Sequence, residues 1–432
     1  MMTENQQYPL QTTNQASVEI ADVPSSGTTL QSSRALLFWL CFLSSLIGGT
    51  VSTLMAVYLP VAVKELVAET GTQLYDNISA SISAIFIFGW MIGGIVWGIC
   101  CDIQGRKKSF VYSTLCYGIF TLLTAFAPNW PVVVICRFLS GFGIGGVLVT
   151  TTLLIVEGYP EKRKAVLLGI LSISIPVGIF SAGLINYFIA GWRHAFIAGI
   201  IPILLSGIAA LFITESESWR NAQTEESNSR NNLRKLFRGD SKSQLIAGSL
   251  VFGAALIGLW ATFSWMPSWI QHLISTGDGQ KERGIAMMMM GGGGLLGGFV
   301  SGWVVNAIGV RKTLMVCFAA SFILCAILFK TTNALSIFTY LQIAIITVFF
   351  GMSQGALSVY IPDLFPVSLR ATATGVCFNL GRFFTGLVVF FIGSLVNFLG
   401  GYGNAIFWFS FVFLIGFFIT RFSKPKTYNH NP

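Results

Sequence analysis

The chain has 432 residues, of which 54% are hydrophobic, 14% are aromatic and only 10% are charged. This balance lies far outside the range of water-soluble domains and excludes an ordinary soluble protein. The formal net charge of +9 comes from bases scattered over many short segments, which argues against a nucleic-acid-binding surface. The composition therefore indicates an integral membrane protein.

The first 33 residues form a mostly polar, unpatterned stretch that lacks the basic start and short apolar stretch of a signal peptide, so we expect a disordered cytosolic tail. After this tail, uncharged apolar runs of about twenty residues, long enough to cross roughly 30 Å of hydrocarbon, recur twelve times. The predicted spans are 36–60, 78–101, 109–128, 130–156, 165–190, 194–214, 244–270, 284–308, 313–330, 335–361, 371–397 and 402–420.

A polar segment containing TESESWRNAQTEESNSRNNLRKLFRGD separates the first six spans from the last six. We therefore predict an all-α integral membrane protein with 12 transmembrane helices in two six-helix bundles. The expected division is a tail at 1–33, a bundle at 34–214, a cytosolic linker at 215–243, a second bundle at 244–421 and a cytosolic tail at 422–432.

The basic residues predict the orientation in the membrane. Most of the 26 Lys and Arg residues fall in loops and tails on one side of the predicted helices. Because short cytoplasmic loops are enriched in these bases, we expect both termini in the cytosol. The loops on the opposite side are short, as at 61–77, which favours a multi-pass protein of a bacterial inner membrane.

The sequence shows no pattern of cysteine, histidine and acidic residues that would form a catalytic or metal site. The eight cysteines fall in or at the ends of apolar spans without metal-ligand spacing, and the three histidines do not cluster with acids or cysteines. Neither a zinc site nor a hydrolytic triad can be assembled from these residues. We expect no cofactor and no enzymatic activity.

Two internal repeats relate the halves of the chain. The stretch GICCDIQGRKK, which starts at Gly98, recurs as GWVVNAIGVRK, which starts at Gly302. A second pair, EGYPEKRKAVLLG and DLFPVSLRATATG, is separated by nearly the same number of positions. Two concordant matches predict two six-helix halves related as a parallel repeat, an arrangement typical of membrane transporters.

The first of these motifs resembles a signature of the major facilitator superfamily of secondary transporters, with Ile103 at a position where a base is usual. RFLSGFGIGG in the fourth predicted helix and TESESW after the sixth are similar to further elements of that family, the latter in its sugar, organic-ion and metabolite branches. The resemblance covers nearly the whole chain after the tail. It implies a carrier that moves a small solute across the lipid bilayer by alternating access, and we expect a monomer.

Asp102, at the end of the second predicted helix, can accept hydrogen bonds from the start of a neighbouring helix. The resemblance implies that this neighbour is the eleventh helix, near Arg370, so that the contact latches the halves on the cytosolic side. Glycine is expected to permit close helix contact at 98 and a tight reversal at 105. The alternative is that the bases here only set the topology. The predicted latch residues are Gly98, Asp102, Gly105, Arg106, Lys107, Glu157, Arg163, Asn306, Gly309, Arg311, Asp363 and Arg370.

Arg137 and Arg382 are the bases that remain inside the predicted spans. Arg382 lies about eleven residues into its helix, or about 16 Å, which places it near the midplane. An arginine there costs at least about 2.5 to 3.5 kcal/mol, so it should face a cavity and meet a partner. All 17 acids fall in the tail, the loops or helix ends, the closest including Asp76.

Because the chain offers Arg382 no acid, we predict that it binds the carboxylate of a small organic anion in a fork geometry. The alternative is that carbonyls, water and amides such as Asn379 satisfy it. Further candidates for substrate contact are Gln354, Tyr360, Trp265 and Arg137, the last of which also suits helix packing or proton handling.

The coupling ion is not defined by the sequence, because the first predicted helix contains no carboxylate. The family resemblance favours proton-coupled uptake, so protons are the expected second partner, while anion exchange and facilitated diffusion stay open. Three other functions also remain: a proton-driven exporter of drugs or amphiphiles, a sugar-type porter, and a sensor of the same fold that binds a ligand without moving it.

Overall fold

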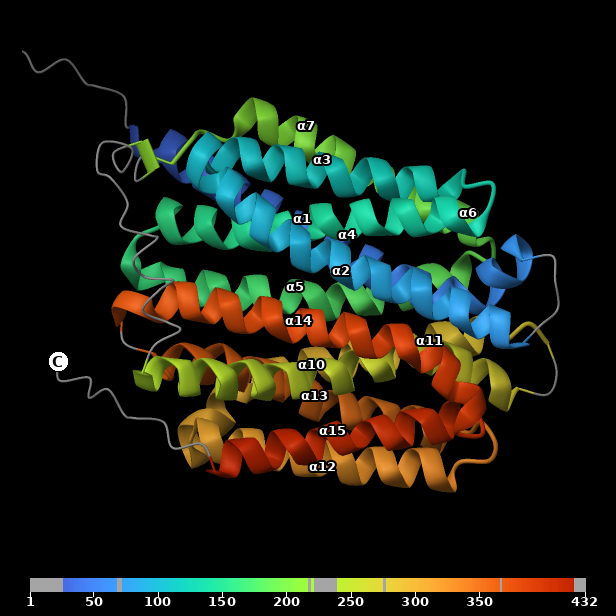
Figure 1. Cartoon of the computed structure of the whole chain (residues 1–432). Coiled ribbons are helices and arrows are strands. Elements are labelled where there is room, and N and C mark those ends of the chain that lie inside the picture. The colour runs from blue at the N-terminus through green and yellow to red at the C-terminus, as the bar shows by residue number, and fades with distance from the viewer. Residues whose placement is uncertain are drawn as a thin grey trace, which may run out of the picture.

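A computed structural model describes residues 26–67, 72–216, 219–220, 239–274, 277–365 and 367–422. Within these ranges the side chains of 26–33, 72–73, 161–162, 165, 239–240 and 367–372 are not described. The described chain is helical throughout apart from its connecting turns. Its long helices run roughly parallel to one another, as Figure 1 shows.

The helices fall into two groups in chain order. The first group is α1 (Ser26–Leu66), α2 (Thr72–Gln104), α3 (Arg106–Ala125), α4 (Trp130–Gly158), α5 (Glu161–Phe188), and a broken helix made of α6 (Trp192–Phe196), a 3-10 turn (Ile197–Gly199) and α7 (Ile200–Phe212). The second group is α10 (Gly239–Leu273), α11 (Gln280–Ile308), α12 (Val310–Thr331), α13 (Ile337–Asp363), α14 (Val367–Phe398) and α15 (Tyr402–Phe422).

The bundle has two ends, which we name by the segments they hold. The termini end, on the left in Figure 1, holds the start of α1 and the end of α15. The far end holds the opposite helix ends, such as the end of α1, the start of α2, the end of α14 and the start of α15. Each of the twelve predicted spans corresponds to one continuous or broken helix, so the predicted fold is confirmed.

Eleven of these helices are long and apolar enough to cross a membrane, counted over the described part of the chain. The twelfth, α3, is less apolar because it contributes five serine and threonine side chains to its packed face, and it begins with three bases. It packs lengthwise against α4 and α7. The buried serine and threonine residues are Ser109, Ser113, Thr114, Thr121 and Thr124.

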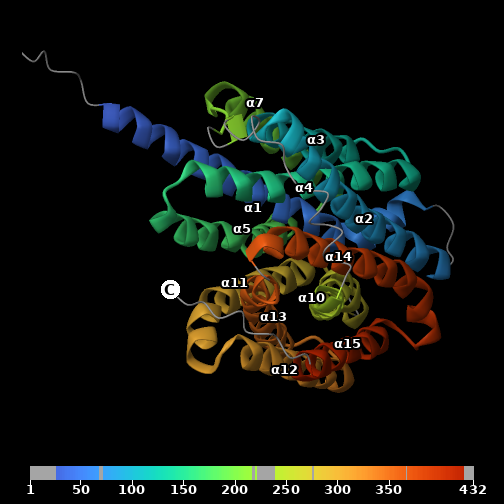
Figure 2. The same cartoon turned by 60° about the vertical axis from the view of Figure 1, so that its left-hand side comes forward.

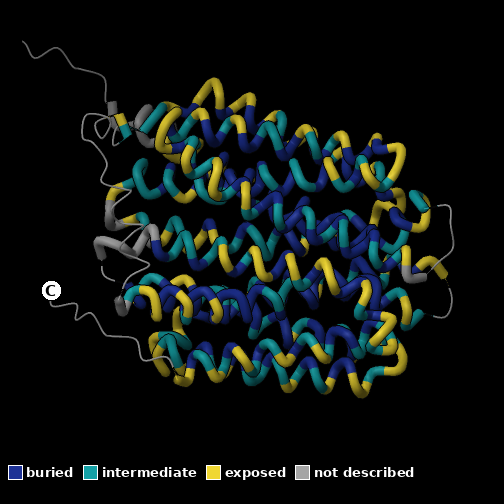
Figure 3. Tube along the Cα trace, viewed as in Figure 1, coloured by how far each residue is buried: buried dark blue, intermediate teal, exposed yellow. Residues whose placement is uncertain are grey.

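The surface of the bundle is apolar along its length. Exposed positions follow the outer helices in Figure 3, and many of them are large hydrophobic residues. Leu211 is 79% exposed and Phe398 is 83% exposed. Apolar surface of this extent is incompatible with water and is the surface that a lipid bilayer solvates.

Glycines set the closest helix contacts inside the first group. A Cβ atom on Gly89 would lie 2.1 Å from the carbonyl oxygen of Phe138, and one on Gly93 would lie 2.0 Å from that of Phe142. Only glycine lets α2 and α4 approach this closely. The close contact that we predicted at Gly98 is wrong, because a Cβ atom there would meet nothing within 4 Å.

The two groups meet mainly along two seams, α2 against α14 and α5 against α11, which can be followed in Figure 2, and α1 also contacts α10. In the second seam, a Cβ atom on Gly183 would lie 2.6 Å from the carbonyl oxygen of Gly284. In the first seam, a Cβ atom on Gly393 would lie 2.4 Å from that of Asp76. Both contacts are near the far end, so the groups are in backbone contact there.

Candidate functional site

Arg382 lies on α14 and points at the first group. Its guanidinium carbon is 5.5 Å from the centre of the Trp90 ring, which belongs to α2. The side chain is partly buried. Among the residues that the structure describes, Arg382 has no hydrogen-bond or ion-pair partner, and the aromatic face is its one electrostatic contact. A guanidinium in this setting retains all of its N–H donors for a ligand.

Two tryptophans build an aromatic wall beside this guanidinium. The ring centres of Trp90 and Trp260 are 5.7 Å apart, and the rings are perpendicular. Trp260 belongs to α10, so α2, α10 and α14 all contribute to the arrangement. Aromatic rings of this kind favour both the cation and a flat apolar ligand.

Asn379 lies one turn before Arg382 on α14. Its Nδ2 atom donates a hydrogen bond of 3.0 Å to the carbonyl oxygen of Gly375. Its Oδ1 atom is buried and has no hydrogen-bond partner within the described chain. The same oxygen would lie 3.4 Å from a Cβ atom on Gly94 of α2. The Asn379 amide oxygen is therefore an unused hydrogen-bond acceptor between the two groups of helices.

Arg137 has a different environment from Arg382. It is 2% exposed, and its two terminal nitrogens donate to the carbonyl oxygens of Val51 and Ser52 at 3.0 and 3.3 Å. Its guanidinium carbon lies 3.9 Å from the centre of the Phe86 ring. These contacts tie α4 to α1 and α2, so in this conformation Arg137 packs helices together and is not open to a ligand.

The remaining candidates lie in the second group. The Nε2 atom of Gln354 on α13 is buried without a partner in the described chain, and Tyr360 on the same helix is 2% exposed. Trp265 of α10 is fully buried, with its ring centre 5.4 Å from that of Tyr402 near the far end. Gln354 Nε2 and Trp265 Nε1 are both N–H donors without a hydrogen-bond partner in the described chain, and N–H donors are the kind of group that binds anions.

A compact charged cluster lies at the termini end of the first group. The Nε atom of Arg106 donates to both carboxylate oxygens of Glu157, at 3.0 and 3.1 Å. Glu215, which follows α7, accepts hydrogen bonds from the backbone N–H groups of Arg106 and Lys107 at 2.8 and 3.1 Å. Glu215 therefore caps the first turn of α3, where free amides favour a carboxylate.

The predicted reversal at Gly105 is present. Its φ angle is +99°, a conformation that side chains disfavour. A Cβ atom at this position would also lie 2.2 Å from Glu215 Oε2, so both the turn and the cap require glycine. Ser216 donates to Glu157, and Trp219 Nε1 donates to the carbonyl oxygen of Asp102 at 3.0 Å. The segment after α7 thus binds α2, α3 and α4 together.

Within the described residues, Asp102 contacts its own group of helices and makes none of the predicted latch contacts with α14. The side chain of Asp102 is 76% exposed and pairs with Arg106, four residues along, at 3.4 Å. Asp363 and Arg163 are also exposed, and the side chain of Arg370 lies outside the described residues. The carboxylate that caps a helix here is Glu215, within the first group.

The repeated motif makes different contacts in the second group. Gly309 again has a positive φ angle, +87°, between α11 and α12. Arg311 donates from Nε to the carbonyl oxygen of Thr420 at 2.8 Å and also to that of Arg421, so it closes the end of α15. Asn306, which replaces the acid, is exposed.

Hydrogen bonds between the two groups gather at the far end. Asp76 of α2 accepts from the hydroxyl of Tyr402 and from Asn397 Nδ2, the latter at 3.3 Å. Ser394 donates to Asn77 Oδ1 at 2.9 Å. In the other seam, Gln280 Nε2 donates to the carbonyl oxygen of Asn186 at 2.8 Å. This end is interlocked, whereas Asp102, Arg163 and Asp363 of the predicted latch are exposed at the termini end.

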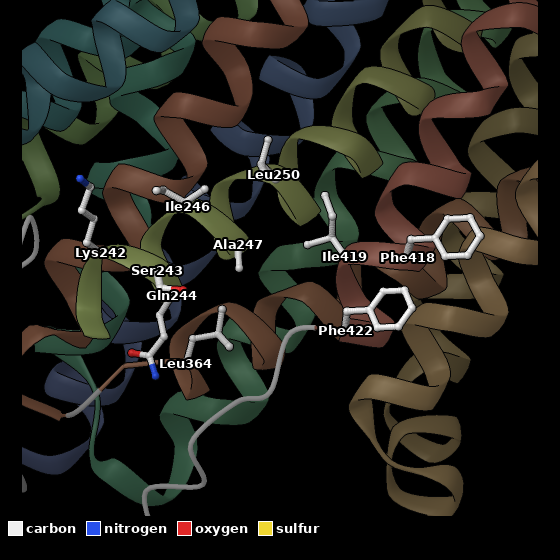
Figure 4. A pocket seen from close by; sticks show the side chains of 10 residues that line it. All are labelled: Lys242, Ser243, Gln244, Ile246, Ala247, Leu250, Leu364, Phe418, Ile419 and Phe422. Atoms are coloured by element: carbon white, nitrogen blue, oxygen red, sulfur yellow. The ribbon is translucent and has the colours of Figure 1, made fainter. Parts of the chain in front are cut away.

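A cavity of about 670 Å³ opens at the termini end, and Figure 4 shows its walls. The cavity lies within the second group, between the start of α10 and the end of α15. None of the predicted substrate residues lines it, so it is separate from the region around Arg382. Its lining is Lys242, Ser243, Gln244, Ile246, Ala247, Leu250, Leu364, Phe418, Ile419 and Phe422.

Sequence reasoning did not single out Trp90 or Tyr402. Each is one of many aromatic residues in apolar spans, and nothing in the local pattern distinguishes it. Asp76 carried a signal, because it is an acid at the edge of an apolar run, but its partners come from the other end of the chain.

The described chain has eleven helices long and apolar enough to cross a membrane, together with α3, and it holds a guanidinium between two groups of these helices, an arrangement that indicates a helical membrane transporter. Residues 39–389 match the profile of the Major Facilitator Superfamily, and the chain belongs to this family. It is a transporter of the class that carries metabolites, sugars or organic anions, and it is not an enzyme.

Relatives at low identity cover most of the chain. The cis,cis-muconate transport protein of Acinetobacter baylyi is 25% identical over 372 residues, which are 83% of this chain and 87% of the relative. The sialic acid transporter NanX of Escherichia coli is 27% identical over 311 residues, 71% of this chain and 75% of the relative.

Solved structures share the fold. A D-xylose-proton symporter matches with a TM-score of 0.76 at 18% identity, over 91% of this chain and 98% of that chain. The xylose transporter of E. coli in an inward open conformation matches with a TM-score of 0.75 at 18% identity, over 92% of this chain and 98% of that chain. At this identity the likeness establishes the fold alone.

Proposed function

We propose that this protein transports a small organic anion, a carboxylate metabolite, and that Arg382 binds its carboxylate group. The observation that carries the proposal is that Arg382, between the two groups of helices, has no hydrogen-bond or ion-pair partner within the described chain. A cation at bilayer depth is stable only with a counter-charge or hydrogen-bond acceptors. A carboxylate supplies both in a fork geometry.

The surroundings support a flat acid as the substrate. Trp90 and Trp260 offer apolar ring surface beside the guanidinium. Asn379 Oδ1 is an unused acceptor for a hydroxyl or N–H group of the same substrate. Two relatives are named for acids, muconate and sialic acid, which agrees with an anionic cargo.

We propose that the termini end faces the cytosol of a bacterial inner membrane, since the loops at that end carry most of the bases. The conformation with an interlocked far end is then inward-facing. We further propose two six-helix bundles, 34–214 and 244–421, that rock about the substrate, with proton-coupled uptake as the cycle.

The test is uptake of labelled aromatic, mono- and dicarboxylic acids, and of neutral sugars, into proteoliposomes with the full-length protein. Charge-assisted hydrogen bonds are worth about 1.5 to 3 kcal/mol, so Arg382→Ala should raise the apparent KM for the acid roughly 10- to 150-fold. Arg382→Lys keeps the charge but loses the fork and should give a smaller rise. Arg421→Ala, which removes an exposed arginine, is the matched control and should leave KM unchanged.

An unaltered KM in both Arg382 variants would show that the anion site lies elsewhere. Uptake of a neutral sugar that is independent of Arg382 would identify a sugar porter, and binding without flux would identify a sensor. A pH jump across the same vesicles tests coupling, because proton-coupled uptake should accelerate when the outside is acidified.

A further inference from the structure

Asp76 occupies an unusual position for an acid in this protein. It is 5% exposed at the far end of α2, in the seam between the two groups of helices. The backbone of α14 touches it, since a Cβ atom on Gly393 would lie 2.4 Å from the Asp76 carbonyl oxygen. A carboxyl group from the first group is therefore enclosed by the second group.

Both carboxyl oxygens are held by neutral donors from the second group. The hydroxyl of Tyr402, the first residue of α15, donates to Oδ1, and Asn397 Nδ2 of α14 donates to Oδ2 at 3.3 Å. Within the described residues, no Lys, Arg or His forms an ion pair with this carboxyl group. The contact is thus a hydrogen-bonded clasp without an ion pair among the described residues.

Few titratable groups face the clasp. Tyr75 precedes Asp76 on α2, and the His272 ring of α10 packs against Tyr402 with 4.8 Å between ring centres. Arg283 of α11 faces Tyr75 and is held by Gln271 and by the carbonyl oxygen of Asp278. His272 is exposed and is the imidazole that packs beside the clasp, so it is the alternative to be tested.

We propose that Asp76 is a proton-binding site that controls the opening of the far end, and that a proton bound there favours the closed, inward-facing conformation. The inference rests on the proposed alternating-access cycle. Opening the far end separates α2 from α14 and α15, so Asp76 loses Tyr402 and Asn397 and gains water.

Solvation of the carboxyl group determines which conformation the proton favours. Water stabilises an ionised carboxylate, whereas burial penalises the charged form and leaves the neutral acid nearly unaffected. Two neutral hydrogen bonds offset part of that penalty. The closed conformation therefore binds the proton more tightly than the open one, and for one proton the ratio of open to closed molecules rises up to tenfold per pH unit.

The experiment measures the distance between the two groups of helices at the far end, in the absence of substrate. Nitroxide-bearing amino acids replace Phe126 at the end of α3 and Ile337 at the start of α13, which are 71% and 76% exposed. The full-length protein in lipid nanodiscs is then examined by pulsed electron resonance from pH 5 to pH 8. The population with the long distance should rise with pH in the wild-type protein.

Asp76→Asn keeps the size of the side chain but cannot ionise, so the closed population should dominate and should no longer change with pH. Glu282→Gln, which alters a far-end acid outside the clasp, is the matched control and should keep the wild-type response. Retention of the pH response by Asp76→Asn, its loss in His272→Gln instead, or no response in the wild type would each overturn the proposal.

A second variant guards against misfolding. Tyr402→Phe removes one donor from the ionised form, so it should increase the open population at pH 8 and change it little at pH 5. An equal change at both pH values would also contradict the proposal. Because no substrate is present, these results are independent of whether Arg382 binds an anion.

Discussion

The contact between Gly183 and Gly284 predicts how a single methyl group would shift the conformational balance. These residues bring α5 and α11 together near the interlocked far end. A Cβ atom on Gly183 would lie 2.6 Å from the Gly284 carbonyl oxygen and 2.7 Å from the Met288 nitrogen. Both neighbours are backbone atoms, which cannot rotate away, so Gly183→Ala should push the seam apart.

The magnitude comes from comparison with a glycine on the same helix. At Gly169, also on α5, a Cβ atom would meet nothing within 4 Å. Replacing either glycine by alanine favours the helix by about 0.8 to 1 kcal/mol. Overpacking at Gly183 costs about 1 to 3 kcal/mol, and only while the seam is closed. Relative to Gly169→Ala, Gly183→Ala should therefore raise the ratio of open to closed molecules roughly 5- to 150-fold.

Hydrogen–deuterium exchange reads out this change. Peptides that contain 183–188 and 280–288 should exchange faster in Gly183→Ala than in Gly169→Ala, while peptides from the α2 and α4 contact should be unchanged. Equal exchange in the two variants, with equal thermal stability, would show that the seam is not a rigid contact and would refute the packing argument.

Two further predictions concern the first group. Glu215→Gln weakens the cap on α3 and should lower the free energy of unfolding by about 0.5 to 2 kcal/mol. Thermal unfolding in detergent measures this loss, and Asp363→Asn, which changes an exposed acid, is the control. Gly93→Ala forces a Cβ atom to 2.0 Å from the Phe142 carbonyl oxygen and should reduce the yield of folded protein, whereas Gly98→Ala meets no atom and should be tolerated. Equal yields for both glycine variants would contradict the assigned α2 and α4 contact.

The helices were predictable because a membrane span is a local property. An uncharged run must be about twenty residues long to cross the hydrocarbon, so its length is legible in one stretch of chain. The observed helices extend beyond several runs, as where α1 reaches Leu66 and α14 begins at Val367, because polar residues continue the helix outside the hydrocarbon. The acid-free neighbourhood of Arg382 was legible for the same reason, from a count of charges.

The contacts of the site were less predictable. The sequence indicated that Arg382 needs a partner but not that it would face Trp90, because that depends on the rotation of α2 against α14. The family resemblance implied that Asp102 contacts the eleventh helix. In this conformation Glu215 provides the helix cap, on α3, and Asp102 is exposed. A carrier changes such contacts during its transport cycle, so one sequence is compatible with more than one set of helix contacts.

Composition, run length and the placement of bases by themselves determined that the chain crosses a membrane twelve times and carries an arginine without a nearby acid. The tertiary structure alone decided which residues meet: Trp90 with Arg382, Asp76 with Tyr402, and Gly183 with Gly284. Insertion into lipid depends on each segment's own hydrophobicity. Partner choice depends on the rotation and crossing of helices far apart in the chain, which their joint packing sets.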